Sequence, residues 1–187
     1  MVSSGTKFTL QEFLALPEGE GDVTYEFVDG DAMPKVSPKF FHSTLQAALI
    51  ILIRAWCKGK GRVCPEWAVI LERQRQAWVP IPDLTYISYD RLSASWKRNE
   101  ACPALPELVI KIISPDQSMK ELESKANDYL NARVSRVWVV DPGTHSIRAF
   151  SPGRASQLYT GTTPIVDPLL PGLELSPRQV LQQAELI

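Results

Sequence analysis

The amino-acid sequence predicts an α/β fold in which helices flank a central β-sheet. Three runs rich in apolar and β-branched side chains are typical of strands, and they span residues 62–72, 82–89 and 106–114. Two stretches, 41–56 and 119–133, instead carry apolar residues at helical spacing. Long strands alternating with long helices indicate a sheet with helices packed on its faces.

The first half of the chain supplies a helix, a hairpin and a second helix. Thr9 and Glu12 form a capping box that predicts a short opening helix. Asp29-Gly30 favours a tight turn, so the segments around it predict a hairpin. A long, largely buried helix follows, and Gly59 and Gly61 end it. Its apolar positions are Phe41, Leu45, Ala48, Leu49, Leu52 and Trp56.

The second half supplies the centre of the sheet, another helix and a second hairpin. The three extended runs carry prolines only at or near their starts, as strands of a sheet centre require. Ser118 and Glu121 form a second capping box, which predicts a helix that runs to about Arg133. Residues 135–141 and 146–150 predict a hairpin across the intervening DPGTH.

Length and composition favour one soluble, cytoplasmic domain. The 187 residues suffice for one buried core. We therefore expect a single domain over 1–187, with its core over about 9–152 and a proline-rich wrapping tail over about 153–187. The apolar run 47–53 is too short for a membrane span, and the N-terminus lacks the pattern of a secretory signal.

Charge and cysteine content exclude several classes of function. The 20 basic and 21 acidic side chains nearly cancel, so any contact with nucleic acid must be local. Three cysteines without CxxC spacing and two histidines are too few for a Cys/His zinc site. The glycine-rich residues 57–63 lack the phosphate-loop pattern and are interpreted as a loop that ends a helix.

Lys111 is the most unusual polar residue, because strand alternation places it inside a run that is apolar on both faces. Burying an ammonium group is costly unless a carboxylate accompanies it. Asp83 and Glu66 lie at the start of, or within, the two preceding extended runs, and they are the candidate partners. Lys111 then either belongs to a functional site or forms a structural ion pair.

Three other polar residues have both a structural and a functional interpretation. Lys125 lies on the apolar side of its predicted helix, where lysines often extend their ammonium to water. Glu26 lies on a short strand beside a turn, where an exposed carboxylate is ordinary. His42 lies near a helix start, where a histidine is more often a cap or core neighbour than a catalyst.

The order and spacing of several segments resemble the Uma-type family of putative restriction endonucleases. The segments are YEFVDG, GRVCPE, PDLTYIS, PELVIKIISPDQS with Lys125 and Tyr129, VSRVWVVDP, and the ending LLPGLELSPRQVLQ. The resemblance covers nearly the whole chain. It implies a restriction-endonuclease-like mixed central sheet flanked by helices, of the PD-(D/E)xK type, with a short final helix.

The same resemblance implies a site for phosphodiester hydrolysis in DNA. Asp83 and Glu66 correspond to metal ligands for Mg²⁺ or Mn²⁺, Glu26 to the family's early glutamate, and Lys125 to its catalytic lysine. Lys111 stands where members usually have a glutamate. An ammonium there should repel the metal ion and remove a ligand, or pair with Asp83 as a built-in counterion.

Three hypotheses follow for the function. The first is a metal-dependent DNA endonuclease that Lys111 impairs. The second is a catalytically inactive domain of the same fold that binds nucleic acid or another protein, with a second copy of the chain as a further partner. The third is a variant residue at position 111 in an otherwise active enzyme.

Overall fold

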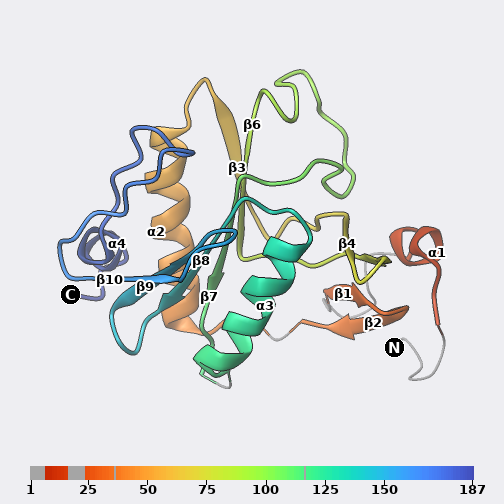
Figure 1. Cartoon of the computed structure of the whole chain (residues 1–187), viewed down its shortest axis with the longest axis horizontal. Coiled ribbons are helices and arrows are strands. Elements are labelled where there is room, and N and C mark those ends of the chain that lie inside the picture. The colour runs from red at the N-terminus through yellow and green to blue at the C-terminus, as the bar shows by residue number, and fades with distance from the viewer. Residues whose placement is uncertain (1–6, 17–23, 36, 116) are drawn as a thin grey trace.

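A mixed six-stranded sheet forms the centre of the computed structural model, which describes residues 7–16, 24–35, 37–115 and 117–187 (Figure 1). Its strand order is β10-β9-β8-β7-β6-β3. The strands are β3 (Gly61–Pro65), β6 (Leu84–Ser88), β7 (Leu108–Ile112), β8 (Arg136–Asp141), β9 (Ser146–Phe150) and β10 (Gln157–Thr160). The β7–β8 pair is parallel and the other pairs are antiparallel, which confirms the predicted mixed sheet.

Helices α2 (Phe40–Trp56) and α3 (Met119–Asn131) cover the two faces of this sheet. Leu45, Leu49 and Ile53 of α2 pack in one core cluster with Leu108, Ile110 and Ile112 of β7. Leu122, Ala126 and Tyr129 of α3 pack in the other, with Val109. The alternation of β7 between the faces is therefore as predicted, and Lys111 is on the α3 face.

The short helix α1 (Leu10–Leu14) and the hairpin of β1 (Tyr25–Val28) and β2 (Asp31–Pro34) lie at one end of the molecule (Figure 1). The capping box of Thr9 and Glu12 is present, as is the turn at Asp29-Gly30. Both turn residues have positive φ, 52° and 87°, which suits a two-residue hairpin turn.

The extended run 62–72 does not form one strand at the sheet centre, so that prediction was wrong. Strand β3 ends at Pro65 and lies at the sheet edge, and Glu66 has a left-handed φ of 47°. The remainder of the run enters a separate hairpin of β4 (Leu71–Arg73) and β5 (Gln76–Trp78). Proline removes a ladder donor and the left-handed residue turns the chain, so the strand cannot continue.

The C-terminal segment packs back on α2 and ends in α4 (Pro177–Gln183), in agreement with the expected wrapping tail and final helix. The indole Nε1–H of Trp56 donates to the carbonyl of Pro171 at 3.0 Å. Strand β10, which the proline pattern did not predict, extends the sheet beside β9. Within the described parts of the chain, no helix is long and apolar enough to cross a membrane.

Candidate functional site

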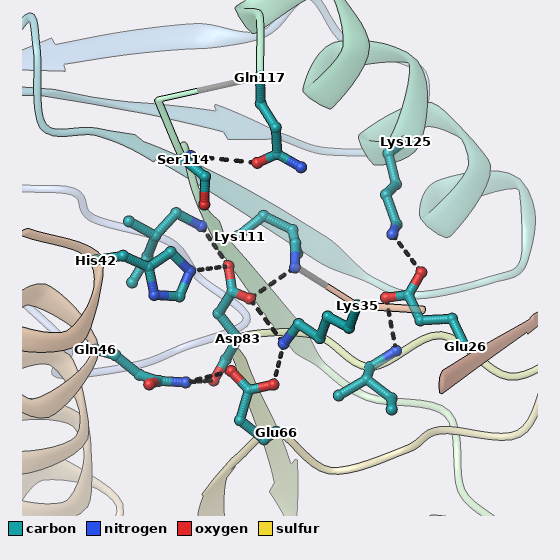
Figure 2. A network of polar contacts seen from close by, with 12 residues as sticks. Glu26, Lys35, His42, Gln46, Glu66, Asp83, Lys111, Ser114, Gln117 and Lys125 are labelled. Carbon is teal, nitrogen blue, oxygen red and sulfur yellow. Dashed lines mark hydrogen bonds and ion pairs between the residues drawn. The ribbon is translucent and has the colours of Figure 1, made fainter. Parts of the chain in front are cut away.

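A pocket of about 390 Å³ lies where β6, β7, α2, α3 and the β1–β2 hairpin meet. Acidic, basic and amide side chains converge there (Figure 2). They are Glu26, Lys35, His42, Gln46, Glu66, Asp83, Lys111, Gln117 and Lys125, and the hydroxyl side chain of Ser114 lines the same pocket. We call this the site pocket. It contains every residue that the sequence predicted for the site, together with others that the sequence did not predict.

Asp83 lies at the bottom of the site pocket, fully buried, immediately before β6. Its Oδ1 accepts a hydrogen bond from the Lys111 ammonium at 2.7 Å, and its Oδ2 accepts one from the Ile112 N–H at 2.6 Å. Lys35 Nζ and His42 Nε2 lie 3.3 Å from Oδ1 and Oδ2, respectively. Both carboxylate oxygens are thus surrounded by donors of this chain.

The register of the sheet explains the contact between Asp83 and Lys111. Leu84 pairs with Ile110 across the antiparallel β6–β7 ladder, so the next position places Asp83 opposite Lys111. Burial alone would raise the pKa of Asp83, but the charge of Lys111, followed by a hydrogen bond from His42, holds that pKa well below its usual range. Asp83 is therefore ionised at neutral pH, with Lys111 as its counterion.

Glu66 reaches the site pocket but contacts a different lysine from the one that the sequence suggested. Its carboxylate accepts hydrogen bonds from Lys35 Nζ and from Gln46 Nε2, the latter at 2.8 Å. Lys35 thereby bridges Glu66 and Asp83. The left-handed backbone at Glu66 directs this side chain after the end of β3.

Glu26 and Lys125 form a further ion pair, on the side of the site pocket away from His42 and Gln46 (Figure 2). Lys125 Nζ donates to Glu26 Oε2 at 2.7 Å, and Glu26 Oε1 accepts the N–H of Ile81 at 3.1 Å. The Lys125 side chain thus points into the pocket. Its pKa is lowered, because burial and the nearby charge of Lys111 outweigh the attraction of Glu26.

Lys35, His42 and Gln46 also line the site pocket, although their positions in the sequence did not predict this. His42 was interpreted as a cap or core neighbour, yet it is 6% exposed and contacts Asp83. Its helical phase carried a usable signal, because Leu45 and Gln46 follow three and four positions later on the same face. Lys35 follows a short hairpin strand, and no pattern in the neighbouring sequence identifies it as a site residue.

The residues of the site pocket fit a divalent cation poorly. Its three carboxylates, Glu26, Glu66 and Asp83, are each paired with a lysine of the same pocket. Among the residues that the structure describes, no group of three or more His, Cys, Asp and Glu side chains could hold a metal ion. A metal ion at Asp83 would have to displace the ammonium of Lys111.

Comparisons with known proteins agree with the fold and assign a family. The chain is similar to a solved structure from Anabaena variabilis, described as a putative nuclease belonging to DUF820. The two are 22% identical, the match covers 95% of this chain and 99% of the other, and the TM-score is 0.78. No curated protein matches this chain significantly. The family model Uma2, described as "Putative restriction endonuclease", matches residues 10–178, and the chain therefore belongs to this family.

Proposed function

We propose that this protein acts on DNA as a phosphodiester hydrolase of the PD-(D/E)xK type, and that Lys111 holds its metal affinity and turnover low. The observation that carries this proposal is the convergence of three carboxylates and three lysines in one pocket. Family membership supports nucleic acid as the substrate. DNA as the substrate in turn favours a cytoplasmic protein.

The lysines of the site pocket are suited to bind a DNA phosphate group. Lys35, Lys111 and Lys125 bring ammonium groups to one cavity, and charge-assisted hydrogen bonds to phosphate oxygens are among the strongest in proteins. Glu26 orients Lys125 through the 2.7 Å ion pair. Since burial lowers the pKa of Lys125, this residue exchanges a proton more readily at neutral pH than an exposed lysine does.

Lys111 is expected to limit hydrolysis. In this class of enzymes a divalent ion bound by carboxylates activates water and stabilises charge on the phosphate. Asp83 is the residue that we propose as the main metal ligand, with Glu66 as the second, and the buried ammonium of Lys111 already occupies Oδ1 of Asp83. A carboxylate at position 111 would replace this positive charge with a third ligand.

Cleavage of supercoiled plasmid DNA in Mg²⁺ or Mn²⁺ tests the proposal. The native protein should cut slowly, Lys111→Glu faster and with higher metal affinity, and Asp83→Ala not at all. Lys120→Glu is the matched control, since it makes the same change of charge at an exposed position of α3. If Lys111→Glu gains neither cleavage nor metal affinity, Lys111 is not what limits this site.

The second candidate is an inactive domain that binds nucleic acid or protein, including a second copy of itself. The pairing of every carboxylate in the site pocket with a lysine favours it. Binding of DNA that depends on Lys125, without cleavage by either the native protein or Lys111→Glu, would select this candidate. Sedimentation velocity separates a homodimer from a monomer.

A further inference from the structure

A groove lined by aromatic rings adjoins the site pocket. Its volume is about 380 Å³, within the range of roughly 300–1,000 Å³ that is usual for ligand sites. His42, Ser114 and Gln117 line both cavities, so the two are adjacent. Phe40 and Phe41, from the first turn of α2, line this second cavity but not the site pocket, and we call it the aromatic groove.

The two phenylalanines are unusually exposed. Phe40 is 68% exposed and Phe41 56%, although the helical pattern had placed Phe41 on the buried side of α2. Their ring centroids are 5.9 Å apart and the planes are tilted by 53°. The next residue, His42, contacts Asp83 in the site pocket. One helical turn thus carries both a contact to the buried acid and a pair of exposed rings.

Both cavities contain acidic and basic side chains, but three lysines gather in the site pocket and the exposed rings gather in the aromatic groove. The site pocket contains the ammonium groups of Lys35, Lys111 and Lys125. The lining of the aromatic groove includes one lysine, Lys39, and one carboxylate, Asp141, whose Oδ1 accepts the N–H of Gly143 at 2.8 Å. An occupant of both cavities should therefore place an anionic group beside the three ammonium groups and a planar group against the rings. A nucleotide unit, with its phosphate and base, has this chemistry.

We infer that the aromatic groove stacks an unpaired nucleobase beside the phosphate held in the site pocket, and that the protein prefers single-stranded to duplex DNA. This inference rests on the proposed function and specifies its substrate class. Aromatic side chains bind single strands by stacking on bases of any sequence. In a duplex the bases are already stacked and paired, so the rings have no free base face to contact.

Fluorescence anisotropy of labelled DNA in EDTA tests the inference without cleavage. The native protein should bind a single-stranded oligonucleotide more tightly than a hairpin duplex of the same length. Phe40→Ala and Phe41→Ala should each weaken single-strand binding about tenfold, or about 1.4 kcal/mol, and leave duplex binding unchanged. Phe41→Tyr should retain affinity because it retains a ring. Ile51→Ala is the matched control, since Ile51 is also exposed on α2, at 54%.

Five outcomes would overturn the inference. Equal affinity for single strand and duplex would do so, as would unchanged single-strand affinity in the Phe40/Phe41 double variant. If that variant instead dissociates a dimer in sedimentation velocity and binds DNA normally, the groove is a contact between two copies. If the native protein binds neither DNA, the proposed function fails as well. If Lys125→Ala loses DNA binding and the phenylalanine variants do not, the inference is refuted but the proposed function is not.

Discussion

Replacing Lys111 by glutamate in the absence of metal should destabilise the fold strongly. Lys111 Nζ lies 2.7 Å from Asp83 Oδ1, and the two side chains are only 8% and 1% exposed. Removal of one partner from a buried pair costs about 3–5 kcal/mol, because the other charge remains buried. Glutamate adds a second carboxylate opposite Asp83, so we expect at least this loss. For a chain of this size, each kcal/mol lowers Tm by about 2–4 °C, which gives a decrease of roughly 6–20 °C.

Divalent metal should reverse part of this loss, and only in the variant. A ligand that binds only the folded state at about 100 times its Kd adds about 2.7 kcal/mol. That corresponds to an increase in Tm of roughly 5–11 °C. The native protein should not gain stability, because Lys111 already neutralises Asp83. Lys111→Met is the matched control, since it also removes the ammonium but supplies no carboxylate.

Thermal unfolding of the three proteins, in EDTA and with increasing Mn²⁺, measures both effects. The expected pattern is a Tm that rises with Mn²⁺ in Lys111→Glu and stays constant in the native protein and in Lys111→Met. The reasoning is refuted if Mn²⁺ raises the Tm of the native protein as much as that of Lys111→Glu. It is also refuted if Lys111→Glu in EDTA melts at the native temperature.

Three further predictions concern pH, packing and DNA binding. Because the pKa of Asp83 is depressed in the folded state, the unfolded chain, with an aspartate pKa of about 3.9, takes up its proton first on acidification. The stability from Asp83 is thus fully present above about pH 5 and declines as pH falls through about 3.9. Urea midpoints between about pH 7 and pH 3 should show this decline, and Asp83→Asn should flatten it. Gly61→Ala should lower the free energy of unfolding by about 1–3 kcal/mol, since a Cβ would lie 2.6 Å from Tyr86 Cε2. An unchanged urea midpoint would contradict this packing argument. Lys125→Ala should weaken DNA binding and reduce its logarithmic salt slope by about 1, whereas Lys120→Ala, in an exposed part of α3, should change neither.

The sequence predicted the polar contact at the sheet centre because its cause is local. A lysine flanked by apolar residues on a strand with two buried faces needs a carboxylate, and Asp83 is that partner. The inward phase of Lys125 likewise depended only on helical spacing. Both predictions start from the position of one lysine within its own element and from the physics of burial.

The other contacts of the site pocket depend on tertiary packing, which spacing does not encode. Lys35 reaches Glu66 only because the β1–β2 hairpin lies beside the pocket. Glu66 itself was assigned to a continuous strand, since neither its left-handed backbone nor the bend after Pro65 alters hydrophobic periodicity. Strand β10 was missed because most of its side chains are exposed, so it carries little alternation.

The ion pair of Glu26 and Lys125 joins residues 99 positions apart. The hydrogen bond from Trp56 to the carbonyl of Pro171 joins residues 115 positions apart. A growing chain therefore cannot complete the site pocket until α3 has been synthesised, and α2 lacks part of its packing until the last segment emerges. Contacts of such long range also make folding slow. During synthesis, Asp83 and Glu26 appear before Lys111 and Lys125, their respective partners, whereas Lys35, the partner of Glu66, is already present. The order of translation thus delays formation of the paired site until the fold is nearly complete.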